Sequence, residues 1–359
     1  MTDRAARRVS GTEGYAESAD ALAEQYESIA FADVHRDLLH LIPAAPAQIL
    51  DIGAGTGRDA AALAALGHNV TAVEPTRELR ARGQRLHRSA RISWIDDALP
   101  DLGTVHERAA RFDLIMLTAV WMHLDAEQRR RAMRGIATVA LVISDVVDME
   151  SIGLNVVSAA QCAGVNRLLW FSSFGAKPEN QARFSRRHPV IDEAVRASGI
   201  PHTILRPNFF MQDFTAFYAE TIRTTGTIYL PLGDARVSHL DLRDLAVAAV
   251  AALKDDRQLN RTFDLSGPEA LHTSEVAEHI GSAIGRPIRY QPITAAAMEA
   301  SLRDAGMDPW FAAGLAELYA WVRDSGLASE VTDSAEQLLG RTPTSFRQFA
   351  IDHRSAFLD

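Results

Sequence analysis

The chain has 359 residues, of which 47% are hydrophobic and 23% are charged, a composition typical of globular proteins. Its formal net charge of −9 at pH 7 disfavours broad electrostatic binding to nucleic acid or to an anionic membrane surface. No run of apolar residues reaches the roughly 18 needed to cross a bilayer. Residues 1–14 are polar and lack the apolar core of a signal peptide. We therefore expect a cytoplasmic protein with a flexible segment at residues 1–14, no membrane or nucleic-acid partner, and an oligomeric state that the sequence leaves open.

Short apolar runs alternate with helical segments along the first two thirds of the chain. In residues 15–45 apolar residues recur three and four positions apart, which predicts a helix. The later runs are continuous in hydrophobicity and rich in β-branched or aromatic residues, which predicts buried parallel strands with helices between them. The predicted strands are 48–52, 69–74, 91–95, 112–118, 140–144, 167–172 and 202–206. This alternation predicts an α/β fold with a doubly wound, Rossmann-like parallel sheet.

After about residue 207 the pattern changes. Short strand signals at 227–230, 237–240 and 262–265 mix with helices up to the C-terminus. This mixture predicts a smaller C-terminal α+β domain that carries elements of a substrate site. Cys162 is the only cysteine, which excludes an internal disulfide framework, and we expect its thiol to be buried in an alanine-rich helix. No cluster of His, Cys or carboxylate residues has the spacing of metal ligands, so we predict no metal site.

A glycine-rich loop follows the first predicted strand. Residues 53–57 read Gly-Ala-Gly-Thr-Gly, between a strand that carries Asp51 and an alanine-rich helix. Glycines let the chain turn sharply and let a ligand approach the backbone, and a helix N-terminus offers free N–H groups. The next strand ends in Glu74, where a carboxylate suits the ribose hydroxyls of NAD or of S-adenosylmethionine. The third strand ends in Asp96 and Asp97, where a carboxylate could accept a hydrogen bond from an adenine amino group.

Four motifs occur in order: LDIGAGTGRD (50–59), VTAVEPT (70–76), WIDDALPDL (94–102) and FDLIMLTAVWMHL (112–124). With them, residues 15–138 resemble the class I S-adenosylmethionine-dependent methyltransferases. The resemblance implies that the glycines face the methionine part and the sugar, that Glu74 holds the ribose, and that Asp97 holds the adenine amine. Residues 118–121 would line the cleft beside the sulfonium, and Tyr26 would help to close the site. The implied cofactor-binding residues are Asp51, Gly53, Ala54, Gly55, Gly57, Glu74, Asp96, Asp97, Thr118 and Val120.

The methyltransferase pattern stops at residue 138, where the family would continue through a Pro-Gly-Gly turn into three more strands. Residues 140–358 instead resemble the NmrA-like branch of the short-chain dehydrogenase superfamily, which includes NAD(P)H-dependent quinone and azo reductases and redox-sensing regulators. The matching stretches are NVVSAAQCAGVNRLLWFSSFGA (155–176), RHPVIDEAVRASGIPHTILRPNFFMQDF (187–214), IYLPLGDARVSHLDLRDLA (228–246), TFDLSGPEALHTSEVAEHIGSAIGRPIRY (262–290) and GRTPTSFRQFAIDH (340–353). The family's G-x-x-G-x-x-G loop and a Y-x-x-x-K pair are both absent from this sequence.

The second resemblance implies candidate residues for substrate binding and catalysis. The Ser172-Ser173 strand end and the segment that begins at Arg206 would lie near the nicotinamide and the substrate. Backbone capping by the serines and a structural ion pair of Arg206 are equally open, and His123 is more readily a loop-fixing residue than a base. The catalytic candidates are His123, Ser173 and Arg206. The predicted substrate pocket comprises Trp121, Phe174, Arg206, Asn208, Phe209 and Phe210.

Both resemblances are to doubly wound sheets, so we predict one composite sheet in which the strand 140–144 pairs with the strand 112–118. The predicted parts are a cofactor-binding half at 15–139, a half completing the sheet at 140–215, and substrate-domain elements at 216–359. The main functional hypothesis is methyl transfer from S-adenosylmethionine to a small organic substrate. An NAD(P)H-dependent oxidoreductase is one alternative. A non-catalytic cofactor sensor, or an inactive recombination product, is another.

Overall fold

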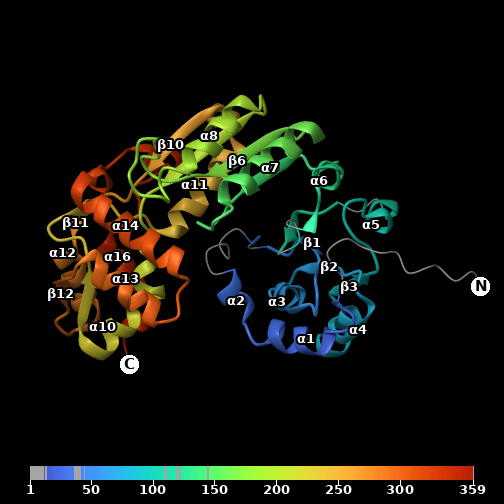
Figure 1. Cartoon of the computed structure of the whole chain (residues 1–359), viewed down its shortest axis with the longest axis horizontal. Coiled ribbons are helices and arrows are strands. Elements are labelled where there is room, and N and C mark those ends of the chain that lie inside the picture. Colours follow the sequence, from blue (N-terminus) through green and yellow to red (C-terminus); the bar gives the residue numbers. More distant parts are fainter. Residues whose placement is uncertain are drawn as a thin grey trace, which may run out of the picture. The chain divides into compact units, whose positions relative to one another are not determined.

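The structure, a computed structural model, describes residues 12, 14–35, 42–43, 45–108, 111–118, 120, 123–143 and 145–358. The chain divides into two compact units, Met1–Gly135 and Ile136–Asp359, drawn from blue to teal and from green to red in Figure 1. Both units combine parallel strands with helices, so the predicted α/β class is confirmed. All seven strands predicted before residue 207 are present, with ends that differ by up to three residues.

The first unit contains a four-stranded sheet in the order β3-β2-β1-β4, in which every pair is parallel. Going along the sheet, the strand order reverses between β1 and β4, and ligands of such sheets bind beyond the carboxyl ends of the strands at this position. The strands are β1 (Gln48–Ile52), β2 (Asn69–Val73), β3 (Ile92–Ile95) and β4 (Leu114–Leu117). The helices are α1 (Ala19–Glu27), α2 (Phe31–Val34), α3 (Arg58–Ala65), α4 (Arg77–Leu86), α5 (Gly103–Glu107) and α6 (Ala126–Ala132).

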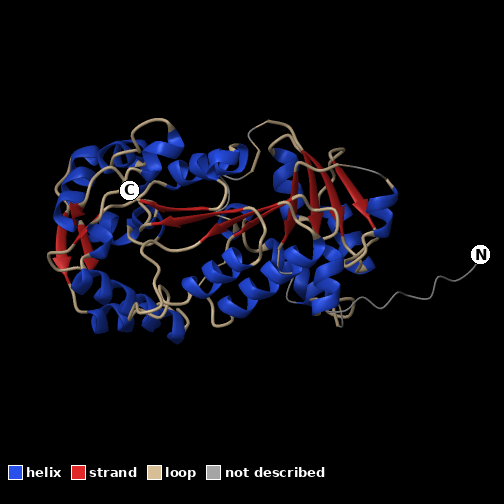
Figure 2. Ribbon diagram, turned by 90° about the horizontal axis from the view of Figure 1, so that it is seen from above, coloured by secondary structure: helices blue, strands red, loops and turns tan. Residues whose placement is uncertain are grey.

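Alternating side chains of the first sheet bury two separate hydrophobic clusters, one on each face. Ile49 of β1 packs with Leu63 of α3 on one face, whereas its neighbour Leu50 packs with Val105 of α5 on the other. Successive side chains of a strand point to opposite faces, so the run of apolar residues in β1 serves both clusters. The continuous hydrophobicity of the strands is therefore explained by a sheet that is covered on both faces, as Figure 2 shows for this unit.

The second unit has its own four-stranded parallel sheet, in the order β10-β7-β6-β5. Leu169 and Phe171 of β6 pack with α11 in one cluster, while Trp170 faces the other side and contacts α8 through Asp192. The strands are β5 (Thr138–Leu141), β6 (Arg167–Phe171), β7 (His202–Pro207) and β10 (Arg261–Leu265). The helices of this part are α7 (Met149–Ala163), α8 (His188–Ala197) and α11 (Leu242–Lys254).

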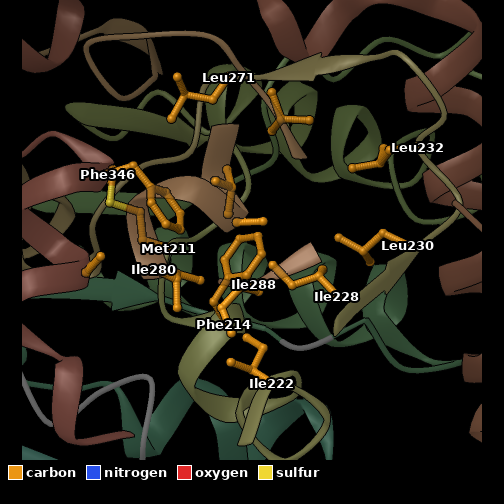
Figure 3. Packing of buried hydrophobic residues seen from close by; sticks show 14 of the residues in the cluster. Met211, Phe214, Ile222, Ile228, Leu230, Leu232, Leu271, Ile280, Ile288 and Phe346 are labelled. Atoms are coloured by element: carbon orange, nitrogen blue, oxygen red, sulfur yellow. The ribbon is translucent and has the colours of Figure 1, made fainter. Parts of the chain in front are cut away.

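Most of the remaining elements of the second unit surround a further hydrophobic cluster, in which Met211, Phe214 and Phe346 meet (Figure 3). The helices are α9 (Asp213–Ala216), α10 (Ala219–Thr225), α12 (Thr273–Ile284), α13 (Ala295–Asp304), α14 (Pro309–Ser325), α15 (Ser334–Leu339) and α16 (Phe346–Asp352). The strands β8 (Thr227–Leu230), β9 (Arg236–Val237), β11 (Leu271–His272) and β12 (Arg289–Pro292) form two short sheets, and three 3-10 turns lie at Asp256–Gln258, Leu327–Ser329 and Arg354–Phe357. None of the described helices is both long and apolar enough to cross a membrane.

Two predictions about the fold are wrong for the described residues, whereas the pairing of the strand 140–144 with the strand 112–118 remains a prediction. The long helix predicted over residues 15–45 is interrupted, with α1 and α2 as separate short helices within its described part. The thiol of Cys162 is exposed, because this position lies on the outer side of α7.

Candidate functional site

A cavity of about 290 Å³ lies in the first unit, at the carboxyl ends of its strands. Loops that follow β1, β2, β3 and β4 contribute to its wall, together with Tyr15 and Tyr26 from the N-terminal segment. This is the position where the strand order reverses, as expected for a ligand site in an open α/β sheet. The polar and charged residues that line it are Thr12, Tyr15, Tyr26, Asp51, Thr56, Arg58, Asp59, Glu74, Asp97, Thr118 and His123.

The glycine loop forms one side of this cavity through Gly53, Ala54 and Gly55. Gly53 and Ala54 donate their backbone N–H groups to the carbonyl oxygen of Val73, at 2.8 and 2.9 Å, which fixes the turn after β1. Gly53 has φ +75°, and a Cβ atom built on it would lie 2.4 Å from Val120 Cγ2. The predicted residues Gly53 and Val120 are therefore in close contact, and only glycine fits at position 53.

Gly57 is part of the loop but does not line the cavity. It lies at the start of α3 with φ +85°, and a Cβ atom there would come within 2.6 Å of the Trp94 indole ring. The same ring would lie 2.3 Å from a Cβ atom built on Gly83 of α4. Gly57 thus lets the helix begin close to Trp94, and a direct cofactor contact of Gly57 remains a prediction.

Asp51 is a buried carboxylate on the cavity wall. Only 2% of its surface is exposed, and its Oδ2 atom has no hydrogen-bond partner among the described residues. Burial, reinforced by the negative charges of Asp59 and Glu74, raises the pKa of Asp51 to about 7, although Arg58 acts in the opposite direction. An unpaired buried carboxylate oxygen is rare in proteins and suits a ligand that brings a cation or a hydrogen-bond donor.

Glu74 lies directly after β2 and connects the glycine loop to the start of α4. Its carboxylate accepts hydrogen bonds from the backbone N–H of Gly55 at 2.8 Å and of Thr76 at 2.7 Å. Burial raises the pKa of Glu74, and these two hydrogen bonds partly oppose the shift. The carboxylate that the sequence assigned to the ribose thus also holds the glycine loop in place.

Asp59 is a cavity residue that the sequence predictions missed, although it follows directly after the glycine loop in the first motif. Its carboxylate accepts hydrogen bonds from His35 Nε2 at 2.6 Å and from Arg58 Nε at 2.7 Å, and Thr118 Oγ1 lies 3.3 Å away. Burial alone would raise the pKa of Asp59, but the hydrogen bonds from His35 and Arg58 lower it below its ordinary value. Asp59 is therefore ionised, and the positive charge of Arg58 balances its negative charge.

The adjacent residues Asp96 and Asp97 differ in position. Asp97 lines the cavity, and its carboxylate accepts from the backbone N–H groups of Ala98, Thr104 and Val105 at 2.9, 2.7 and 3.1 Å. Asp96 is not part of the cavity lining: its side chain is 70% exposed and pairs with Arg80 at 2.8 Å. The structure therefore does not bring Asp96 to the predicted site, whereas Asp97 anchors the loop that leads to α5.

Tyr26 lines the cavity as predicted, and its ring lies 3.4 Å from where a Cβ atom on Gly55 would be. Tyr15 and His123 also line the cavity, with their rings perpendicular and 6.5 Å apart. Thr118 and Val120 complete this side of the wall. Trp121, which the sequence placed in the substrate pocket, lies outside the described residues.

Arg206, a predicted catalytic and substrate-pocket residue, takes part in a buried ion pair of the second unit. Its Nε and Nη2 atoms lie 3.0 and 2.5 Å from Oδ2 of Asp192, whose side chain is fully buried. The other oxygen of Asp192 accepts a hydrogen bond from Trp170 Nε1 at 2.7 Å. Of the two roles that the sequence left open for Arg206, the structure shows the structural ion pair.

The other predicted substrate-pocket residues are packed into the second unit and do not line the cavity. The Asn208 amide donates to Ser238 Oγ and to the Ala328 carbonyl oxygen, and its Oδ1 accepts from the Phe209 N–H, so its polar atoms are satisfied. Phe209 and Phe210 pack against different hydrophobic clusters. Phe174 is buried as well. These side chains therefore have packing roles, and a substrate contact remains a prediction for them.

The serine pair lies at the carboxyl end of β6. Ser172 is buried and its Oγ has no hydrogen-bond partner among the described residues. The predicted residue Ser173 is partly exposed, and its carbonyl oxygen accepts from the Ala176 N–H in a turn. Within the described ranges, no three His, Cys, Asp or Glu side chains gather closely enough to hold a metal ion.

Residues 49–140 match the model of a methyltransferase domain, and residues 118–350 match the model of the NmrA-like family. The chain is 34% identical over 226 residues to the NAD(P)H azoreductase of Xenophilus azovorans. This alignment covers 63% of this chain and 78% of the azoreductase. It is 33% identical over 228 residues to the (4-alkanoyl-5-oxo-2,5-dihydrofuran-3-yl)methyl phosphate reductase of Streptomyces griseus. This second alignment covers 63% of this chain and 79% of the reductase.

Solved structures share the fold. The NADPH-dependent quinone oxidoreductase QOR2 of Escherichia coli, complexed with NADPH, superimposes with a TM-score of 0.61 at 20% identity, covering 85% of this chain and 99% of that one. The triphenylmethane reductase of Citrobacter sp. gives a TM-score of 0.60 at 20% identity, with 85% and 99% covered. Because the family model spans well over half of the chain and the two relatives named above exceed 30% identity, the chain belongs to the NmrA-like family.

Proposed function

We propose that the cavity of the first unit binds S-adenosylmethionine and that the protein transfers its methyl group to a small organic molecule. The acidic lining of the cavity carries this proposal. Among the described residues, four carboxylates line it, from Asp51, Asp59, Glu74 and Asp97, against one guanidinium, that of Arg58. A cofactor that brings positive charge is favoured in such a site, since opposite charges attract more strongly where water is excluded.

The same lining disfavours a dinucleotide. The pyrophosphate of NAD(P)H carries two negative charges, which dinucleotide-binding loops place on a helix N-terminus. In this cavity it would meet the buried carboxylate of Asp51, whose Oδ2 atom has no hydrogen-bond partner among the described residues. Glu74 suits the ribose hydroxyls of NADH but would repel the 2′-phosphate of NADPH.

Within this proposal, Glu74 and Asp97 would hold the adenosine part and Asp51 the methionine part. The sulfonium supplies an already activated methyl group, so the protein has mainly to bind and orient the reactants. Asp59, held by His35 and Arg58, would keep Thr118 in position on the adjoining wall. Tyr15 and Tyr26 would shield the cavity from water.

Binding of the cofactors tests the proposal directly. Isothermal titration calorimetry with S-adenosylmethionine, NADH and NADPH should give binding only for the first. Mass spectrometry of small molecules released from the purified protein should then detect S-adenosylmethionine or its demethylated product. Binding of neither cofactor class at millimolar concentration would leave only a sensor of another ligand or an inactive protein.

An NAD(P)H-dependent oxidoreductase is the second candidate, and the relatives favour it over the first. The NAD(P)H azoreductase of Xenophilus azovorans is 34% identical over 226 residues. The sequence nevertheless lacks the G-x-x-G-x-x-G loop expected of an NmrA-like protein. Tight binding of NADPH without binding of S-adenosylmethionine would establish this candidate and reject the first.

Replacing Glu74 by alanine should weaken S-adenosylmethionine binding by about 1–3 kcal/mol, the cost of losing charge-assisted hydrogen bonds. The variant also leaves the N–H groups of Gly55 and Thr76 without their acceptor, so the glycine loop loses its support. Titration calorimetry of the purified variant measures the change. Glu78→Ala, at an exposed acid of α4, is the matched control. An unchanged affinity in Glu74→Ala would remove Glu74 from the site.

A further inference from the structure

The helices α1 and α2, labelled in Figure 1, are held in the first unit by different kinds of contact. α2 is anchored by burial, since Phe31 is 8% exposed and belongs to the hydrophobic cluster of Ile49 and Leu63. Directly after α2, His35 pairs with Asp59, and both side chains are only 7% exposed. α2 is thus fixed to the core of the unit at both ends.

α1 buries much less apolar surface. Its buried residues are two alanines, Ala19 and Ala23, whereas Leu22 and Tyr26 are partly exposed. An alanine side chain offers little apolar area, so its burial stabilises the helix weakly. The connection from α1 to α2 runs through residues 28–30, which are all exposed. A helix with few buried apolar contacts and an exposed connection can open locally while the rest of the unit stays folded.

Polar bonds hold α1 in place, and Glu27 at its end makes two of them. The Glu27 carboxylate accepts a hydrogen bond from Thr56 Oγ1 at 2.5 Å, and His87 Nε2 lies 3.0 Å from the same oxygen. Thr56 belongs to the glycine loop, lines the cavity and is 1% exposed, so this bond fastens α1 to the site itself. Asp20 pairs with Arg82, but the Asp20 side chain is 83% exposed, and such pairs stabilise little.

The segment that contains α1 forms one side of the cavity. Tyr15 and Tyr26 line the cavity, and the Tyr26 ring lies against the glycine loop at Gly55. Arg58 of the opposite wall donates to the Tyr26 carbonyl oxygen at 3.3 Å. Movement of the segment away from the loop would therefore remove both tyrosine rings from the wall and open the cavity to solvent.

We propose that residues 14–27 are a cover of the cavity, which moves about residues 28–30, and that Glu27 is the latch that holds it shut on Thr56. This deepens the proposed function and rests on it in one respect, because the ligand that the cover retains is S-adenosylmethionine. The cover opens when its polar bonds break, while α2 stays in place. Loss of the latch should therefore speed both the opening of the cover and the release of the ligand.

Hydrogen exchange followed by mass spectrometry tests the latch in the ligand-free protein. Glu27→Ala should speed the exchange of residues 14–27 at least about tenfold, because a hydrogen bond to a charged group is lost, and should leave residues 31–35 unchanged. Glu27→Gln keeps an oxygen that can accept from Thr56 and should stay within about threefold of the unaltered protein. Glu24→Ala, at an exposed acid of the same helix, is the matched control and should not change the exchange.

S-adenosylmethionine then tests whether residues 14–27 cover the cavity. A saturating concentration should slow their exchange in the unaltered protein, and a chase with unlabelled cofactor should show at least about tenfold faster release from Glu27→Ala. Equal exchange in Glu27→Ala and Glu24→Ala would overturn the latch, and cofactor binding without slower exchange would overturn the cover. Both results would leave the proposed cofactor intact. Failure of S-adenosylmethionine to bind would overturn the proposed function, whereas the exchange of the ligand-free variants would still decide on the latch.

Discussion

Asp51→Asn is expected to stabilise the ligand-free protein above neutral pH. Burial raises the pKa of Asp51 from an ordinary value of 3.8 to about 7 in the folded protein. Holding this carboxylate ionised inside the fold therefore costs about 4 kcal/mol of unfolding free energy at pH 8, since each unit of pKa corresponds to about 1.4 kcal/mol. Asparagine fills the same space without a charge, so the variant avoids this cost.

The sign of the pH dependence follows from the direction of the pKa shift. The folded protein binds a proton at Asp51 that the unfolded chain releases between about pH 4 and pH 7. The stabilising contribution of the protonated acid is complete below about pH 4 and is lost as the pH rises to about 7. The difference in melting temperature between Asp51→Asn and the unaltered protein should thus grow over this range. A difference that stays constant from pH 4 to pH 8 would show that Asp51 does not titrate in the folded state near neutrality.

Arg206→Ala is expected to lose about 3–5 kcal/mol of unfolding free energy in the second unit, because it leaves the fully buried Asp192 carboxylate without its cation. Urea unfolding followed by tryptophan fluorescence measures the loss. Trp170 is a suitable reporter, since its indole N–H donates to Asp192.

Two further variants separate this ion pair from its surroundings. Arg196 lies 3.9 Å from Asp192, but its side chain is 40% exposed, so Arg196→Ala should change stability by less than about 1 kcal/mol. Adding Asp192→Asn to Arg206→Ala should recover part of the loss, because no buried charge then remains. A loss below about 1 kcal/mol in Arg206→Ala alone would return Arg206 to the list of candidates for a ligand contact.

The strands of both units could be predicted from the sequence, whereas their pairing could not. Continuous apolar runs such as that of β1 are required wherever both faces of a sheet are covered, and this requirement is local. The partner of β5 is not a local property. Its four residues pair with β6, which follows only after the helix α7.

The candidate site was predictable where a motif places a residue on the cavity wall, as for Asp51, Gly53, Glu74 and Asp97. It was not predictable where a neighbouring residue decides the role. Asp96 and Asp97 are equivalent in sequence, but consecutive side chains point in different directions, and only Asp97 reaches the cavity.

Distant partners explain the other differences. Arg206 is paired with Asp192, which lies 14 residues earlier on α8. Asp59 is hydrogen-bonded to His35, which lies 24 residues earlier in the chain. No periodicity or local motif encodes such contacts, because they depend on how helices pack on the sheet.

The contact of Trp94 with two glycines has a consequence for the evolution of the first unit. Its indole ring occupies the space where side chains at Gly57 and Gly83 would begin. The carbonyl oxygen of Thr56 would also lie 2.5 Å from a Cβ atom at position 83, so the backbone itself excludes a side chain there. Among homologous methyltransferase-like sequences, we therefore expect glycine to persist at position 83 even where position 94 carries a smaller side chain than tryptophan.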